Sequence, residues 1–246
     1  MPHSSIVHDL RSAHSADALL TGVPLPTLLY FALPIILGNI FQQLYSIVDA
    51  IVVGNFLGDL PLSGISVASP IVDVANALVI GGTIGVGVLC AHYCGAGEGE
   101  RLRCMNATAL LGGGALTLLI ALCGIFFSTP LLQAQGTEEA VCREAAVYLQ
   151  LVFAGLLFCF LYNYYAAMLR STGDALTPGL ISIFTCVLDI IFNFFLINPT
   201  REMTVFGQNL TVWGLGWGVP GAALGTALAN AVGGTLALGV LLLRDG

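Results

Sequence analysis

The strongest constraint on this chain is a set of six apolar stretches, each near or above the ~20 residues with which a helix crosses a bilayer. The stretches cover residues 29–54, 65–91, 105–127, 145–168, 176–197 and 218–242. Charged residues make up only 9% of the chain, whereas soluble domains usually carry about 25%. Because the stretches are continuous and do not alternate in polarity, they indicate helices and not porin-like strands. We therefore predict an all-α integral membrane protein, namely a six-transmembrane-helix bundle.

The ends and loops of the chain predict how this bundle is oriented. Residues 1–24 are polar and lack the apolar region of a signal peptide, so we expect a cytoplasmic N-terminal tail before one six-helix unit at residues 25–243. An even number of spans places both termini on one side. That side carries Arg11, Arg101, Arg103, Arg170 and Arg244, and the other carries Arg143 and Arg201. The positive-inside rule therefore predicts that both termini are cytoplasmic.

The charge balance argues against two further classes of site. The net charge is −7, the chain has no lysine, and no basic patch is present, so we expect no nucleic-acid partner. Cys90, His92 and Cys94 lie close together, but a closed zinc site needs four ligands. We therefore predict no metal site.

Three carboxylates fall within the apolar stretches, namely Asp49, Asp73 and Asp189, and no arginine or lysine lies there to neutralise them. A charge at the bilayer centre costs at least ~2.5 kcal/mol. Each aspartate must therefore face a packed bundle or a watery cavity, or carry a proton. We expect Asp49 and Asp189 to be functional, and we interpret Asp73, near the start of its span, as interfacial or as a local cap.

Helical spacing of about 100° per residue groups the polar residues of three spans into stripes. The first span presents Asn39, Gln42, Tyr45, Ser46 and Asp49; the fifth Ser182, Thr185, Cys186, Asp189 and Asn193; and the sixth Thr226 and Asn230. The stripes predict a polar chamber inside the bundle. Ser182 and Thr185 are also explained by hydrogen bonds to their own helix backbone. Interhelical hydrogen bonding explains Asn39, Gln42 and Asn230 equally well.

Small residues follow a second pattern in the last span. Gly218, Gly221, Gly225 and Ala229 recur at the spacing with which helix backbones approach closely. In the first span, Pro34 is deep enough to weaken or kink the helix.

Four segments resemble the multidrug and toxic compound extrusion (MATE) family of efflux antiporters. They read LPIILGNIFQQLYSIVDAIVVGNFLG, YCGAGEGER, YNYYAAMLRSTGDALTPGLI and GVPGAALGTALAN, and they occur in the order that the family shows. The resemblance covers nearly the whole chain. It implies one six-helix bundle, the N-lobe, of a twelve-helix fold in which two bundles face a central cleft.

The resemblance also implies a role for individual residues. In one branch of the family, a polar cluster on the first, fifth and sixth helices binds the coupling ion. The matching residues here are Tyr45, Asp49, Asp189, Asn193 and Thr226. Pro34 would supply a bend that responds to the ion. Asn39, Gln42 and Asn230 are weaker candidates for the substrate cavity.

The chain departs from the family in two ways. The usual order on the fifth helix is Asn and then Asp, whereas here Asp189 precedes Asn193, which moves the carboxylate by one turn, about 5.4 Å. The chain also holds only one bundle, so we expect a partial chain that lacks the C-terminal lobe, or a half-transporter that pairs with a second copy.

The predicted function is secondary active multidrug efflux from the plasma (cell inner) membrane, with organic cations or other drug-like xenobiotics as substrates. The protein is then no enzyme and has no cofactor besides its coupling ion, H⁺ or Na⁺, both of which suit Asp, Asn and Thr oxygens. One alternative is a flippase for lipid-linked saccharides, which favours a cationic cleft. Others are an intramembrane aspartyl protease and a fragment without transport activity.

Overall fold

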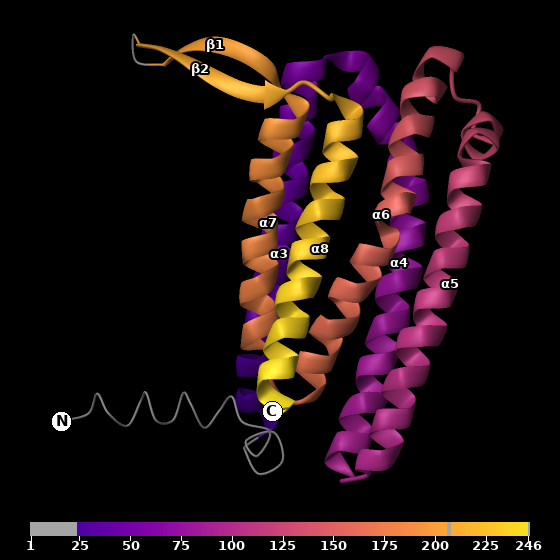
Figure 1. Cartoon of the computed structure of the whole chain (residues 1–246), viewed down its shortest axis with the longest axis vertical. Coiled ribbons are helices and arrows are strands. Elements are labelled where there is room, and N and C mark those ends of the chain that lie inside the picture. The colour runs from indigo at the N-terminus through magenta and orange to yellow at the C-terminus, as the bar shows by residue number, and fades with distance from the viewer. Residues whose placement is uncertain (1–23, 206–207, 246) are drawn as a thin grey trace.

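Six long helices form the body of the protein in the computed structural model, which describes residues 24–205 and 208–245 (Figure 1). The helices are α3 (Pro24–Leu57), α4 (Asp59–Gly95), α5 (Gly99–Ala134), α6 (Glu139–Ser171), α7 (Leu176–Ile197) and α8 (Val219–Asp245). All six are long and apolar enough to cross a membrane. The predicted six-helix membrane bundle is therefore confirmed.

Most of the helices extend beyond the predicted apolar stretches. The 22 residues of α7 rise about 33 Å, which matches a hydrocarbon core of about 30 Å. The 37 residues of α4 rise about 55 Å, so this helix projects beyond the core. Most connections between the helices are therefore shorter than the loops between the predicted apolar stretches. Gly58 alone separates α3 from α4, with a φ of 86° that favours glycine.

The helices run up and down, so their connections lie at two opposite ends of the bundle (Figure 1). One end holds the start of α3, the α4–α5 and α6–α7 connections and the end of α8. The opposite end holds the α3–α4 and α5–α6 connections. Both ends of the described chain thus lie together, as an even number of spans requires.

The segment between α7 and α8 differs from the loop that we expected at residues 198–216. It forms an antiparallel hairpin of β1 (Pro199–Val205) and β2 (Gln208–Leu215). The hairpin projects from the end of the bundle (Figure 1). Threonine and valine recur in both strands and favour extended backbone. The apolar stretches, which dominate the sequence, gave no indication of this short pairing.

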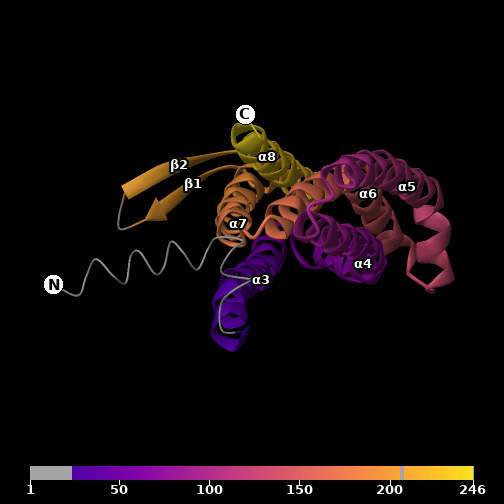
Figure 2. The same cartoon turned by 90° about the horizontal axis from the view of Figure 1, so that it is seen from below.

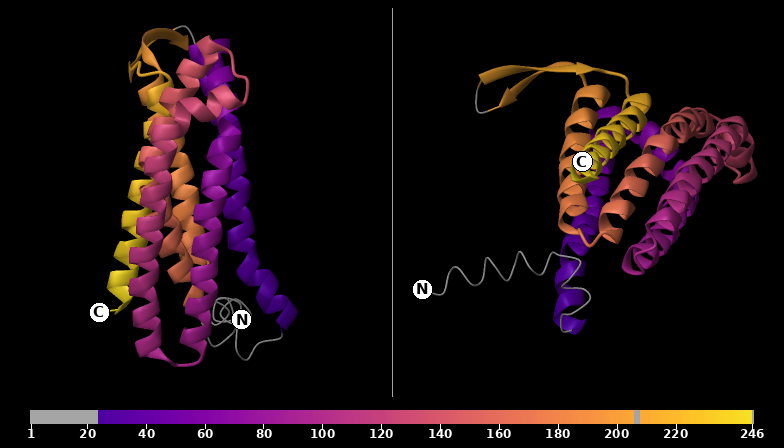
Figure 3. Two further views of the ribbon diagram at one scale, coloured as in Figure 1. Left: turned by 90° about the vertical axis from the view of Figure 1, so that its right-hand side faces the viewer. Right: turned by 60° about the horizontal axis from the view of Figure 1, so that its bottom comes forward.

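The six helices divide into two groups (Figures 2 and 3). In one group, α7 packs between α3 and α8, and in the other, α6 packs against α4 and α5. Contact between α6 and α8 joins the groups. The close approach is made by small residues: a Cβ on Gly155 of α6 would lie 2.7 Å from the Ala227 Cβ of α8.

The buried core lies mainly along α6. Leu149, Phe153, Leu156 and Phe160 are almost fully buried there, against α4 and α5. Phe160 packs so closely on α5 that a Cβ on Gly113 would lie 2.8 Å from its ring. The outward faces of the helices carry exposed leucine, isoleucine and phenylalanine side chains. This distribution suits a bundle surrounded by lipid.

Candidate functional site

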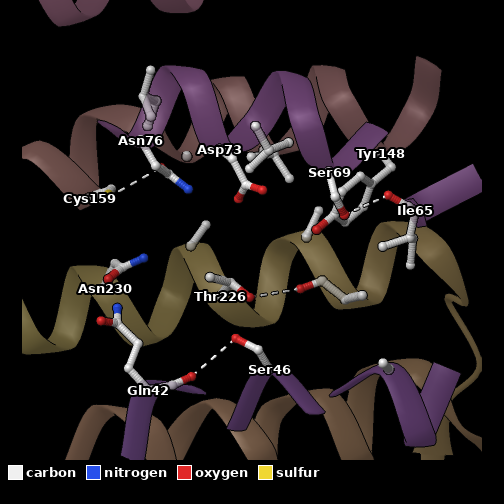
Figure 4. Close-up of a pocket in the computed structure, with 18 of the residues that line it drawn as sticks. Gln42, Ser46, Ile65, Ser69, Asp73, Asn76, Tyr148, Cys159, Thr226 and Asn230 are labelled. Carbon is white, nitrogen blue, oxygen red and sulfur yellow. Dashed lines mark hydrogen bonds between the residues drawn. The ribbon is translucent and has the colours of Figure 1, made fainter. Parts of the chain in front are cut away.

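A cavity of about 580 Å³ opens between the two groups of helices. Residues of α3, α4, α6 and α8 line it. The close-up shows polar side chains from three of these helices facing one another across it (Figure 4). Its size falls in the range of about 300–1,000 Å³ that is usual for small-molecule sites. The predicted stripes of the first and sixth spans thus contribute to this cavity, whereas the described lining includes no residue of the fifth span.

A second, much smaller pocket of about 30 Å³ lies beside the cavity and contains Asp189. Such a volume holds about one or two water molecules, or an ion. Gln42, Tyr162, Thr226 and Asn230 line both spaces. These four side chains, which we call the shared wall, connect the surroundings of Asp189 with the large cavity.

Asp189 and Asn193 occupy adjacent turns of α7 but meet different surroundings. Asp189 is 3% exposed and lines the small pocket. Asn193 is 1% exposed and lies against Gly225 of α8, where an added Cβ would clash with its Oδ1. Asn193 is not among the described residues that line either space. Asp189 and Asn193 share one face of α7, but the packing of α8 gives them different surroundings.

The other predicted site residues are distributed as follows. Gln42, Thr226 and Asn230 belong to the shared wall, whereas Asn39 is exposed and is not among the described lining residues. Tyr45 and Asp49 lie on α3, but their side chains are outside the described residues. Their contribution to the site stays a prediction.

Pro34 lies within α3 and contacts α7. A Cβ on Gly179 of α7 would lie 3.2 Å from both the Cβ and the carbonyl oxygen of Pro34. The missing N–H of Pro34 removes one backbone hydrogen bond of α3 at this crossing. The predicted bend thus has its weak point where α3 touches α7.

The interpretation of Asp73 as a helix cap is wrong, whereas its position at the membrane interface stays a prediction. Asp73 lies well inside α4, is exposed, and lines the large cavity. Ser66, Ser69 and Asn76 line the cavity with it. Their spacing of three and four residues places all four on one face of the helix. The spacing of Ser66, Ser69, Asp73 and Asn76 is visible in the sequence, although the predicted stripes did not include it.

The structure also shows hydrogen bonds of two side chains that the sequence analysis considered, Thr185 and Cys90. The Thr185 hydroxyl donates to the Ser182 carbonyl at 2.8 Å, which confirms the predicted backbone hydrogen bond. The Cys90 thiol lies 2.9 Å from Asn106 Oδ1. Within the part of the chain that the structure describes, no three His, Cys, Asp or Glu side chains are grouped to hold a metal.

A bundle of membrane-spanning helices that encloses a polar cavity is typical of a transport protein. The comparison with known families identifies the kind of transport protein. The MatE family model matches residues 34–195, and the chain belongs to this family.

Relatives and a solved structure agree with this assignment. The probable multidrug resistance protein YoeA of Bacillus subtilis (strain 168) is 30% identical over 177 residues, which are 72% of this chain and 37% of YoeA. The probable multidrug resistance protein YpnP of the same organism is 29% identical over 86% of this chain and 44% of YpnP. The crystal structure of a MATE transporter in the bent conformation matches with a TM-score of 0.78 and 25% identity, over 93% of this chain and 48% of that one.

The chain spans less than half the length of these curated relatives. In the solved structure, the matched part is likewise about half. The match concerns one six-helix bundle. It places the chain among multi-pass membrane transporters.

Proposed function

We propose that the chain is the N-terminal six-helix half of a secondary active multidrug efflux antiporter, coupled to H⁺ or Na⁺. One observation carries the proposal: the buried carboxylate of Asp189 lies in an ion-sized pocket that shares a wall with a drug-sized cavity. Antiport requires that binding of the ion and binding of the cargo influence each other. The shared wall supplies direct contact between the two spaces.

The chemistry of Asp189 suits the coupling step. Asp189 lines so small a pocket that a cation or a proton bound there would interact directly with its carboxylate. Gain or loss of the ion therefore changes how α3, α7 and α8 pack around the pocket. Because Gln42, Thr226 and Asn230 also line the large cavity, this change alters the drug site. Differential affinity between two such states drives alternating access.

Further residues join this scheme through the family resemblance. Tyr45 and Asp49 of α3 would complete the ion site, Asn193 would support it from the next turn of α7, and Pro34 would allow α3 to bend. The bundle would lie in the plasma membrane with both termini cytoplasmic. A second six-helix bundle, in the same polypeptide or in a second copy of this chain, would complete the cleft.

The described lining favours drug efflux over a flippase for lipid-linked saccharides. A pyrophosphate group calls for arginine or lysine. Among the described residues around the large cavity, the charged side chain is Asp73, and the lining includes neither arginine nor lysine. Membership of a transporter family likewise favours transport over the protease hypothesis.

Drug resistance tests the proposal. We expect Asp189→Asn to lower the resistance of a drug-hypersensitive bacterial strain to the level of empty vector, because the coupling carboxylate is lost. Asp59→Asn is the matched control, since Asp59 is exposed in the first turn of α4 and does not line the cavities. Full resistance of Asp189→Asn, at equal protein in the membrane, contradicts the proposed coupling site.

Transport in proteoliposomes identifies the coupling ion. A fluorescent cationic drug is loaded, and either a proton gradient or a sodium gradient is imposed. We expect one gradient to drive drug movement in the wild-type chain and neither to do so in Asp189→Asn. Equal movement without any gradient would contradict secondary active transport.

A further inference from the structure

The serine and threonine hydroxyl groups around the large cavity share one pattern of hydrogen bonding. Each donates its proton to a carbonyl one turn back on its own helix. The bonds run from Ser46 to Gln42 (3.1 Å), from Ser66 to Leu62 (2.8 Å), from Ser69 to Ile65 (2.9 Å) and from Thr226 to Ala222 (3.3 Å). A hydroxyl has one proton and two lone pairs. These four side chains therefore present only acceptors to the cavity.

Asp73 adds a negative charge among these acceptors. Its carboxylate projects from α4 into the cavity beside Ser69, and Thr226 of α8 and Ser46 of α3 lie across the space (Figure 4). Among the described residues, none donates a hydrogen bond to Asp73 or pairs with its charge. This part of the cavity, which we call the acceptor end, is thus negative and rich in acceptors.

The opposite part of the cavity has a different character. The amide side chains of Gln42, Asn76 and Asn230 gather there (Figure 4). An amide carries both donors and an acceptor. The cavity therefore has an amide end, which accommodates either kind of polar group, and an acceptor end, which favours donors.

An aromatic ring accompanies the acceptor end. Tyr148 of α6 lies near Ser69 at this end of the cavity (Figure 4). The face of an aromatic ring attracts cations. Val72 and Ile65 of α4 add apolar lining to the cavity. A molecule with one cationic group and an apolar body fits this combination.

We propose that the acceptor end is a subsite for a protonated amine of the cargo, with Asp73 as its counter-charge. This inference rests on the proposed function. A primary ammonium brings three N–H donors, whereas a quaternary ammonium of the same charge brings none. Hydrogen bonds between charged partners are roughly twice as strong as neutral ones. The subsite therefore selects cargo by its hydrogen-bond donors as well as by its charge.

The test compares two fluorescent probes that differ only in their donors. One is a dansyl-labelled primary alkylammonium, and the other is its trimethylammonium analogue. Each is titrated against the full chain in lipid nanodiscs. We expect the wild-type chain to bind the primary ammonium about tenfold more tightly. Removal of the counter-charge by Asp73→Asn lowers this affinity about tenfold, whereas Asp73→Glu, which keeps the charge, retains the preference.

Two further variants separate donors from charge. Ser69→Ala removes one acceptor, so it weakens the primary ammonium about threefold and leaves the trimethylammonium analogue unchanged. Asp59→Asn removes a carboxylate from the same helix outside the cavity and changes neither affinity. Thermal unfolding checks that every variant is folded.

The outcomes distinguish this inference from the proposed function. Equal wild-type affinity for both probes overturns donor selection, and unchanged ammonium binding by folded Asp73→Asn overturns the role of Asp73. The proposed function survives both results. If the wild-type chain binds no probe and confers no drug resistance, the proposed function fails and the inference fails with it.

Discussion

Two carboxylates in the middle of apolar helices have opposite surroundings in this protein. Asp189 of α7 is 3% exposed, in a pocket of about 30 Å³. Asp73 of α4 is exposed to a cavity of about 580 Å³. The two aspartates are therefore suited to two different tasks. The first carboxylate has room for an ion, and the second has room for a molecule.

The helices around each carboxylate explain this difference. Asp189 lies within the group of α3, α7 and α8, where glycines on α8 bring the backbones together. A Cβ on Gly221 would lie 2.8 Å from the Leu196 carbonyl, and one on Gly225 would clash with Asn193. Asp73 faces the space between the two groups. Close packing of α8 against α7 around Asp189, and open space in front of Asp73, thus assign the two roles that we propose.

The largest effect is expected when the carboxylate is moved within α7. The double variant Asp189→Asn, Asn193→Asp restores the order usual in the family while it keeps one carboxylate on this helix face. We expect drug resistance to stay at the level of empty vector, because residue 193 packs against Gly225 and not in the small pocket. Resistance clearly above that of Asp189→Asn would show that either turn supplies the coupling group.

A smaller effect is expected from the packing that encloses Asp189. Gly225→Ala forces a methyl group against Asn193, and such overpacking typically costs about 1–3 kcal/mol. We expect a lower midpoint of thermal unfolding in detergent. Gly239→Ala on the same helix is the control, because an added Cβ there has nothing within 4 Å. Equal midpoints for the two variants would contradict the close contact between α7 and α8.

The smallest effect is expected from a single hydroxyl of the shared wall. Thr226→Val keeps the shape of the side chain and removes one acceptor from the cavity, so we expect about threefold weaker binding of the primary ammonium probe. Thr235→Val is the matched control. Its hydroxyl also donates to its own helix, at 2.8 Å to the Ala231 carbonyl, but the residue is exposed outside the cavities. Equal losses in both variants would indicate a helix effect and not a binding effect.

The sequence predicted those features that depend on one helix at a time. Hydropathy predicted the six helices, and helical spacing predicted the stripes that contain Asp189 and Thr226. Asn39 and Gln42 illustrate the limit. They belong to the same predicted stripe, yet Gln42 lines both spaces and Asn39 is not among the residues that do. Whether a polar residue lines a cavity depends on which neighbouring helix packs against it. The sequence of a single span does not indicate which helices are its neighbours.

The position of Asp73 at the large cavity was not predicted, for the same physical reason. Asp73 has serine and asparagine partners at helical spacing, but a stripe becomes a site only when other helices leave space in front of it. That space depends on how α6 joins the two groups of helices. The hairpin after α7 was not predicted for another reason. Two short paired strands leave a weaker pattern in the sequence than long apolar stretches do.

The most direct test of two separate carboxylate sites is the affinity for the primary ammonium probe as a function of pH and Na⁺ concentration. It is measured on the wild-type chain, Asp189→Asn and Asp73→Asn in nanodiscs. We predict that Asp189→Asn still binds the probe but with an affinity that no longer responds to the coupling ion. Asp73→Asn binds more weakly and still responds. Loss of the response in Asp73→Asn, or its persistence in Asp189→Asn, would contradict the separation of the ion site from the cargo site.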